Sequence, residues 1–505
     1  MRWSGFACAT RAIKDNRPYP RAFLTLKKSP PLFWLAANSI CQVQANADSG
    51  MMSLIVVNPA TGRRIASYRE HSRAAIERAL VQAESAQASW RKLSLAQRAR
   101  PLRALAAELR THRDALAALI TDEMGKPVAQ GRGETEKSAT LCEYYARNTQ
   151  ALLGPERPIG APAHTRVIFE PLGTLLAIMP WNFPVWQAIR ATIPAVIAGN
   201  AVLLKHAPNV PGCALALEKL FVRAGFPPGL FQVLLIRTEP IAGLIADHRV
   251  HAVTLTGSTA AGKAVAALAG AAMKPGVFEL GGSDAAIVLA DAALDHAAET
   301  CANARLLNSG QSCVCAKRFI VVRSVLREFE ERFTSRMAAR RVGDPTDATT
   351  DVGPLARADL RDGVAAQVKA SIRCGARVLL GGHALPGPGF FYAPTVLTNV
   401  KPGMPAYDEE VFGPVGAIIA VRDEAEAIRV ANDSRFGLGA SLFTRNRARS
   451  RRLIPQIESG CVFVNDFVRS SPELPFGGIK ESGYGRELGP WGARAFSNVK
   501  TIWGG

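Results

Sequence analysis

The sequence has few cysteines and few aromatic residues, and it has no long apolar run. Nine cysteines in 505 residues are too few for a disulfide scaffold, and their irregular spacing fits a reducing compartment in which one thiol can act as a reagent. The nearest candidate for a membrane span, residues 174–189, is interrupted by Pro180, Asn182 and Pro184. We therefore expect a cytoplasmic protein without a membrane partner.

Acidic residues are also scarce, with 42 Asp and Glu against 61 Lys and Arg, which gives a net charge of +19. Such a charge can attract nucleic acid. The basic residues are nevertheless dispersed, and no basic tract with interleaved aromatic residues is found. We therefore expect a solvated basic surface and no nucleic-acid partner. A hydrophobic content of 48% predicts a large globular core.

The first 50 residues differ from the rest, because they carry seven basic and only two acidic residues. Lys27 and Lys28 precede an apolar stretch, but a secretory signal would start nearer the N-terminus. We interpret residues 1–50 as a disordered leader or a misassigned extension, with folding from Met51 or Met52.

Beyond this segment, residues 73–121 have the apolar spacing of long helices. From Gly173 short β-type runs alternate with helical stretches, and a second α/β segment runs from about 285 to 463. This alternation predicts a parallel sheet with helices on both faces. The expected strands are 175–179, 201–204, 231–236 and 253–255, and the expected helices are one following Pro184 and those at 211–224, 240–247 and 259–272.

Two glycine-containing motifs carry candidate chemistry. Thr256–Gly262 follows a strand and opens a helix, so it can bind a phosphate or simply cap the helix. The second motif is Asn308–Cys315. In it, Cys313 follows a glycine at an expected helix–loop junction, where a cysteine can have a lowered pKa and act as a nucleophile. No neighbouring Cys/His set completes a metal site, so we expect no metal. Cys315 is either a packing residue or a disulfide partner of Cys313 upon oxidation.

Further motifs are each compatible with a simple turn. The motif Phe278–Gly282 places Glu279 at the end of an expected strand, where it can act as a base. The motif Pro180–Pro184 contains Asn182, whose side-chain amide can donate a hydrogen bond to a developing oxyanion. The segments 409–414 and 475–483 add Glu-Glu-Val-Phe-Gly-Pro and Pro-Phe-Gly-Gly-Ile-Lys-Glu-Ser-Gly.

Taken together in this order, the motifs make the chain resemble the NAD(P)-dependent aldehyde dehydrogenase superfamily from about Asn58 to Trp503. The two most specific signatures, Glu-Leu-Gly-Gly and Gly-Gln-Ser-Cys, place Glu279 and Cys313 34 residues apart. The resemblance implies that Cys313 is the nucleophile, that Asn182 and the Cys313 N–H form the oxyanion hole, and that Glu279 is the general base.

The resemblance also implies the residues that bind NAD or NADP. A departure from many NAD-preferring members is Pro208, which stands where they carry a glutamate, so the preference between the two cofactors stays open. The cofactor-binding residues implied are Trp181, Lys205, Gly257, Ser258, Glu410 and Phe412.

By the same resemblance, the fold is α/β, with a Rossmann-type domain, an α/β catalytic domain and a small oligomerisation element that forms a homodimer or homotetramer. The implied boundaries are 51–150 and 172–280 for the dinucleotide-binding domain, 281–478 for the catalytic domain, and 151–171 and 479–505 for the oligomerisation element.

The substrate is the least constrained feature. The chain is most similar to bacterial succinate-semialdehyde dehydrogenases, which implies that Arg190 helps to bind a distal carboxylate, with Ser470 or Arg469 as second anchor, because Leu307 replaces the second arginine of some members. Alternatively, Arg190 forms a structural ion pair in an enzyme for uncharged or aromatic aldehydes. A CoA-acylating semialdehyde dehydrogenase is disfavoured by Glu279, and an inactive binding homologue by Glu279 together with Cys313.

Overall fold

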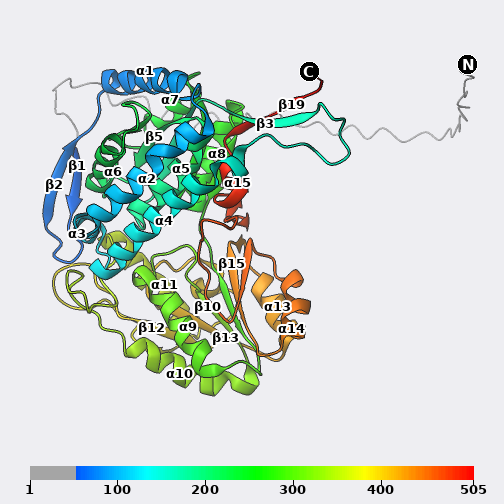
Figure 1. The fold of residues 1–505 in the computed structure, drawn as a ribbon. Coiled ribbons are helices and arrows are strands. Elements are labelled where there is room, and N and C mark those ends of the chain that lie inside the picture. The colour runs from blue at the N-terminus through cyan, green and yellow to red at the C-terminus, as the bar shows by residue number, and fades with distance from the viewer. Residues whose placement is uncertain (1–52, 505) are drawn as a thin grey trace, which may run out of the picture. The chain divides into compact units, whose positions relative to one another are not determined.

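The computed structural model describes residues 53–504, and the predicted leader lies outside the described residues. Within them, two mainly parallel sheets organise the chain (Figure 1). The first has the strand order β18-β8-β7-β4-β5-β6, and only β18 runs antiparallel to its neighbour. Its strands are β4 (Thr174–Met179), β5 (Ala201–His206), β6 (Phe231–Val233), β7 (Val250–Thr256), β8 (Gly276–Glu279) and β18 (Gly483–Tyr484).

Every residue of β4 and β5 is buried, as the nearly continuous apolar sequences of these strands require in a sheet covered on both faces. Two of the crossover helices begin with a proline, Pro184 and Pro211, at the first helical position, where proline is favoured. The crossover helices are α5 (Pro184–Ala198), α6 (Pro211–Arg223), α7 (Ile241–Ala246) and α8 (Thr259–Ala271).

Four helices precede this sheet in the chain and appear in blue to cyan in Figure 1. Ser94 begins the second of them with a capping box, in which its side chain and that of Gln97 each bind the other's main-chain N–H. These helices are α1 (Arg73–Trp90), α2 (Leu95–Thr111), α3 (Arg113–Met124) and α4 (Val128–Leu153).

The second sheet has the order β11-β12-β13-β10-β9-β15-β16 and lies below the first in the view of Figure 1. Its strands are β9 (Ala285–Val288), β10 (Arg318–Val322), β11 (Arg377–Leu380), β12 (Thr395–Thr398), β13 (Val415–Val421), β15 (Gly439–Phe443) and β16 (Cys461–Val464). Its helices are α9 (Leu294–Leu306), α10 (Leu326–Ala338), α11 (Ala358–Arg373), α12 (Pro405–Asp408), α13 (Glu424–Asn432) and α14 (Arg447–Leu453).

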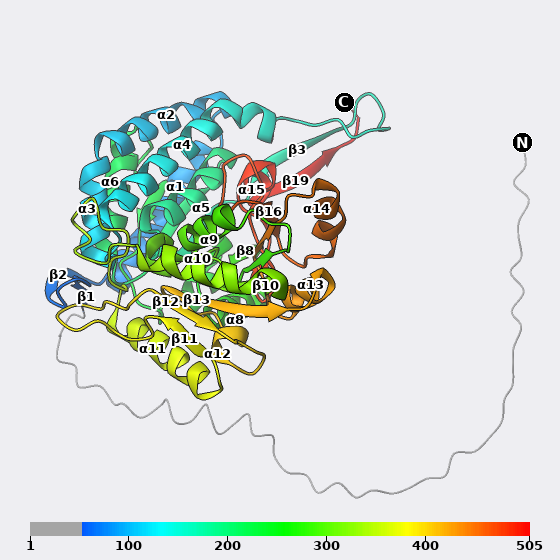
Figure 2. The same ribbon diagram turned by 90° about the horizontal axis from the view of Figure 1, so that it is seen from below.

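Three antiparallel pairs complete the described strands. One of them, β3 with β19, stands away from the helices in both views (Figure 1, Figure 2). The pairs are β1 (Ser53–Val57) with β2 (Arg64–Arg69), β14 (Phe436–Gly437) with β17 (Ile479–Lys480), and β3 (Arg166–Pro171) with β19 (Ser497–Ile502); α15 (Gly489–Arg494) precedes β19.

The α/β prediction is confirmed, whereas the domain boundaries and the oligomerisation element stay predictions. Between residues 53 and 504, no helix combines the length and the apolar character needed to cross a bilayer.

The strand order positions the functional site. From β4 the chain proceeds outward to β5 and β6, and from β7 it proceeds in the opposite direction to β8. The sheet therefore has a switch point between β4 and β7, and in such sheets ligands bind beyond the carboxyl ends of the strands at this point.

Candidate active site

A cavity of about 380 Å³ opens beyond the carboxyl ends of β4, β7 and β8. It brings together residues that are far apart in the sequence, and Lys205, Arg190 and Ser470 are not on its wall. The predicted site residues that line it are Trp181, Asn182, Gly257, Ser258, Glu279, Cys313, Glu410 and Phe412.

Cys313 reaches this cavity from a turn with unusual backbone geometry. After α9, the 3₁₀ turn η1 (Leu307–Gly310) places Asn308 and Ser309 in the left-handed region, with φ of 54° and 55°. Gly310 follows with φ of 77°, and a Cβ there would lie 2.2 Å from the Gly413 oxygen. Only glycine fits this position, so the sequence Asn-Ser-Gly builds a strained turn just before the thiol.

Two buried cations hold this loop in place. Lys317 Nζ donates hydrogen bonds to the main-chain oxygens of Cys313 (2.8 Å), Ser312 (3.1 Å) and Cys315 (3.2 Å). Arg305 donates to the oxygens of Gly310 and Ala316. Lys317 is not among the residues predicted from the sequence; the signal for it is a lysine directly before the buried apolar strand β10.

Burial raises the pKa of the Cys313 thiol to about 12, although the charges of Arg190 and Lys317 lower it. The expectation of a lowered pKa is therefore wrong: loss of hydration outweighs the nearby cations. Cys313 consequently needs a base to accept its proton. All seven cysteines of the described residues are free thiols, and the neighbouring Cys315 is buried.

Glu279 ends β8 and is only 2% exposed. Within residues 53–504, neither of its carboxylate oxygens has a hydrogen-bond partner. Burial and the nearby Glu487 raise its pKa well above the usual value for a glutamate, and Arg190 and Arg486 oppose this shift. A carboxylate with a raised pKa is a stronger base, which suits proton abstraction from a thiol or water.

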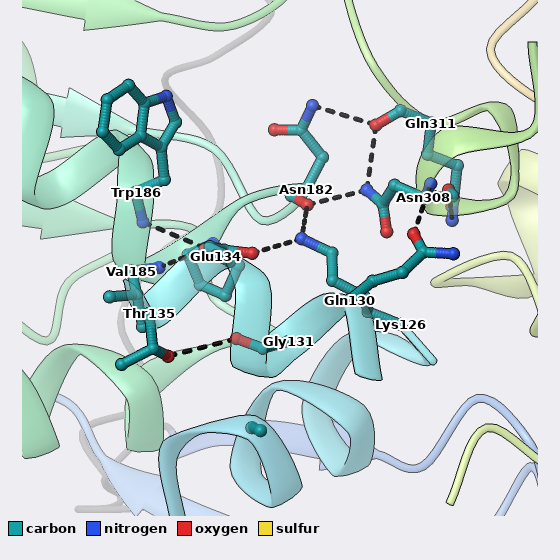
Figure 3. A network of polar contacts seen from close by, with 12 residues as sticks. Lys126, Gln130, Gly131, Glu134, Thr135, Asn182, Val185, Trp186, Asn308 and Gln311 are labelled. Atoms are coloured by element: carbon teal, nitrogen blue, oxygen red, sulfur yellow. Dashed lines mark hydrogen bonds and ion pairs between the residues drawn. The ribbon is translucent and has the colours of Figure 1, made fainter. Parts of the chain in front are cut away.

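Asn182 is held from both ends of the residue (Figure 3). Its side-chain Nδ2 donates to the Gln311 oxygen at 3.1 Å, and its main-chain oxygen accepts from Lys126 Nζ at 2.9 Å and from Asn308 Nδ2 at 2.7 Å. One N–H of the amide is used in this way, and the other is left for a ligand. In the described part of the chain the Cys313 main-chain N–H donates to no protein acceptor.

Behind Asn182 lies a buried ion pair whose residues are not among those predicted from the sequence. Glu134 Oε1 accepts from the main-chain N–H groups of Val185 (2.8 Å) and Trp186 (3.0 Å), while its other oxygen pairs with Lys126 (Figure 3). Glu134 thus caps the N-terminus of α5, where a negative charge is favoured. The Asn182 turn and α5 are therefore fixed by α4.

The other side of the cavity has the features of a dinucleotide site. Trp181 and Phe412 meet edge to face, with ring centroids 5.8 Å apart. Glu410 accepts from the Gly282 N–H at 3.1 Å, and a Cβ on Gly281 would lie 2.3 Å from it, so this glycine permits the approach of the carboxylate. Apolar ring walls suit a nicotinamide, and a carboxylate suits ribose hydroxyls.

Phosphate groups would lie toward the N-terminus of α8, where Ser258 accepts a hydrogen bond from the Ala261 N–H. Lys205 is the last but one residue of β5, near the same edge of the sheet; it is buried, and burial lowers its pKa. The residues present therefore fit an NAD(P) cofactor. Across residues 53–504, no group of three or more His, Cys, Asp or Glu side chains is arranged to hold a metal.

The family model "Aldehyde dehydrogenase family" matches residues 46–502. The chain belongs to the aldehyde dehydrogenase family. Among its relatives, succinate-semialdehyde dehydrogenase (NADP+) 1 of Mycobacterium tuberculosis is 47% identical over 90% of this chain and 100% of its own. Succinate semialdehyde dehydrogenase (NAD(P)+) Sad of Escherichia coli is 44% identical over 89% of this chain and 97% of its own.

A solved structure of succinic semialdehyde dehydrogenase from Streptococcus pyogenes in complex with NADP+ matches with a TM-score of 0.86 and 37% identity, over 89% of this chain and 99% of the other. The predicted family and the aldehyde dehydrogenase fold are thus confirmed. The roles of the individual site residues stay predictions.

In this aldehyde dehydrogenase the candidate substrate residues lie off the cavity wall. Arg190 is 2% exposed; its Nε forms an ion pair with Glu487, and a terminal nitrogen lies 3.3 Å from Thr256 Oγ1. This is the geometry of a structural ion pair, the alternative considered above. Ser470 accepts a hydrogen bond from Lys137, and Arg469 pairs with Asp466.

Proposed function

We propose that this aldehyde dehydrogenase oxidises succinate semialdehyde to succinate with NAD+ or NADP+. The observation that carries the proposal is the single cavity lined by Cys313, Asn182 and Glu279 together with the residues suited to a dinucleotide. The choice of succinate semialdehyde as substrate is supported by relatives of 44–47% identity that are named succinate-semialdehyde dehydrogenases. Pro208, in place of an acceptor for the ribose hydroxyls, supports use of the 2′-phosphorylated cofactor as well.

The first step is the attack of Cys313 Sγ on the aldehyde carbon. The thiol proton passes to Glu279, and a C–S bond forms while the carbonyl oxygen takes up the electron pair of its π bond. The free N–H of the Asn182 amide and the Cys313 main-chain N–H stabilise this oxyanion. Removing one such donor typically costs about 10²–10³ in rate.

The cofactor would be held by the residues on the other side of the cavity and at the ends of β5 and β7. These are Trp181, Lys205, Gly257, Ser258, Glu410 and Phe412. When bound, NAD(P)+ supplies the acceptor for the two electrons and one hydrogen that leave the substrate carbon. The acyl group is then linked to Cys313 as a thioester. Glu279, after passing its proton to solvent, removes a proton from water, which attacks the acyl carbon and releases succinate and the thiolate.

The test is an assay of the purified protein with succinate semialdehyde and with an uncharged aldehyde of similar length, using NAD+ and NADP+ in turn. We expect cofactor reduction without added CoA and a higher kcat/KM for succinate semialdehyde. Preference for the uncharged aldehyde would contradict the substrate assignment, and an absolute requirement for CoA would contradict hydrolysis by Glu279.

We also propose a homodimer or homotetramer in the cytoplasm. The exposed Val499 and Trp503 on or beside β19, 60% and 75% accessible, support an interface on the β3–β19 pair. The need for a free thiol supports a reducing compartment. Light scattering of the full chain and of Val499→Asp tests the assembly, which we expect the variant to weaken; cell fractionation tests the location.

A further inference from the structure

The start of α4 contacts both of the loops that supply donors to a substrate oxyanion (Figure 3). Lys126 Nζ donates to the main-chain oxygen of Asn182 at 2.9 Å. Four residues later, Gln130 Oε1 accepts from the main-chain N–H of Asn308 at 2.8 Å. The first of these loops carries the Asn182 amide, and the second leads to the Cys313 main-chain N–H. A single helix end therefore holds the supports of both donors.

The two loops are also bound directly to each other. Asn308 Nδ2 donates to the main-chain oxygens of Asn182 (2.7 Å) and Gln311 (3.1 Å), and Asn182 Nδ2 donates to the same Gln311 oxygen at 3.1 Å. Asn308 and Gln311 are fully buried, and Asn308 has a φ of 54°, a conformation that persists only where the surroundings hold it. The distance between the two donors thus depends on this buried set of contacts.

Lys126 is itself fixed by a second buried charge. It is 1% exposed, and its ammonium pairs with Glu134, which is 5% exposed and caps α5. The same ammonium lies 3.8 Å from the centre of the Phe183 ring. Pairing offsets the cost of burying the two charges, so the ammonium has a defined place. Lys126 and Gln130 are not on the cavity wall, so they can affect the reaction only through the residues they hold.

We propose that Lys126 and Gln130 are positioning residues for aldehyde oxidation, which set the placement of the Asn182 amide relative to the Cys313 main-chain N–H. The inference deepens the proposed function and rests on it. Donors stabilise a developing oxyanion only if they already stand where the charge forms. A displacement of about 1 Å, caused by a change outside the reacting centre, can cost about 10² in rate.

The test compares Lys126→Met and Gln130→Met with wild type. We expect kcat to fall about 10- to 100-fold in each, because the donors are displaced. The KM of the aldehyde and the Kd of NADP+ should stay within about threefold of wild type, because the contacts of the ground state remain. The loss should be equal for succinate semialdehyde and an uncharged aldehyde of similar length. Matched controls are changes at an exposed lysine of α6 and an exposed glutamine of α4, Lys219→Met and Gln150→Met.

A double-mutant cycle with Asn182→Ala separates positioning from general damage. Alanine removes the donor but keeps the main-chain oxygen that Lys126 binds. Lys126→Met should therefore slow the Asn182→Ala enzyme by no more than about threefold, because the group that it positions is already absent. An equal fold loss in the wild-type and Asn182→Ala backgrounds would overturn the proposal.

Alkylation of Cys313 by iodoacetamide gives a readout that does not depend on turnover. This reaction builds no oxyanion, so its rate at a given pH should be the same in Lys126→Met as in wild type. A fall comparable to that of kcat would show that the thiol itself is displaced, and it would overturn a role through Asn182.

The outcomes distinguish this inference from the proposed function. If Asn182→Ala turns over as wild type does, the amide is not an oxyanion donor and both proposals fall. If Asn182→Ala is slow but Lys126→Met and Gln130→Met keep the wild-type kcat, the positioning role alone falls. Should Lys126→Met not fold because Glu134 is left unpaired, Lys126→Met combined with Glu134→Gln removes both charges and enters the same cycle.

Discussion

The ammonium of Lys317 lies 2.8 Å from the main-chain oxygen of Cys313, and its charge lowers the pKa of that residue's thiol. One side chain thus fixes the position of the nucleophile and favours its ionised form. Substitution of Lys317 removes both effects, and the pH dependence of the Cys313 thiol reports the electrostatic one.

Lys317→Met should move the alkylation of Cys313 to higher pH. Removing the cation raises the thiol pKa further, so less thiolate is present at a given pH. The rise of the alkylation rate with pH should therefore occur at higher pH. The measurement is the pH dependence of Cys313 labelling by iodoacetamide, followed by mass spectrometry. Lys219→Met, a change at an exposed lysine of α6, is the control. An unchanged profile would show that Lys317 has no electrostatic effect on the thiol.

Cys313→Ala should abolish turnover while the protein stays folded and binds its cofactor, because no other group can form the covalent acyl intermediate. Cofactor titration and initial rates check this. The matched control is Cys374→Ala, a change at the exposed cysteine that directly follows α11, which should leave the rate unchanged. Wild-type turnover by Cys313→Ala would remove the assignment of the nucleophile.

Glu279→Gln should give one burst of reduced cofactor per site and then turn over about 10² times more slowly or worse, because the amide cannot activate water. Rapid mixing resolves the burst from the steady phase. A steady rate equal to that of wild type would mean that another group is the base.

Arg190→Met should destabilise the fold by about 3–5 kcal/mol, since it leaves Glu487 as an unpaired buried charge. Urea unfolding measures the change in the free energy of unfolding. The double variant Arg190→Met, Glu487→Leu should recover most of the lost stability. Failure of the double variant to recover would show that the ion pair is not the source of the loss.

Features encoded locally were the most predictable from sequence. The strand expected at 175–179 is observed as β4, the helix at 259–272 as α8, and Glu279 stands at the end of its strand as expected. The predicted strand 231–236 stops at Val233: the Leu234 N–H still binds the Leu204 oxygen, but the chain then turns and the Ile236 N–H binds the Leu234 oxygen.

What could not be predicted depends on side chains that converge from distant segments. Lys137 meets Ser470 across 333 positions of sequence, and Lys126 meets Asn182 across 56. Both lysines flank or lie in α4 and resemble ordinary surface charges in the sequence. Likewise, the cost of burying the Cys313 thiol depends on packing that no motif records.

The pairing of β18 with β8 has a consequence for synthesis of the protein. Gly483 lies opposite Glu279, and Gly477 packs so closely against its carboxyl that a Cβ there would lie 2.5 Å from Oε1. The wall behind the base is thus made of residues translated some 200 positions later. A nascent chain that has already folded its first sheet still has an open edge at β8, and it acquires a competent base only when this late segment leaves the ribosome. Premature termination before Gly477 should therefore yield inactive chains with an unpaired strand edge, a feature that favours aggregation.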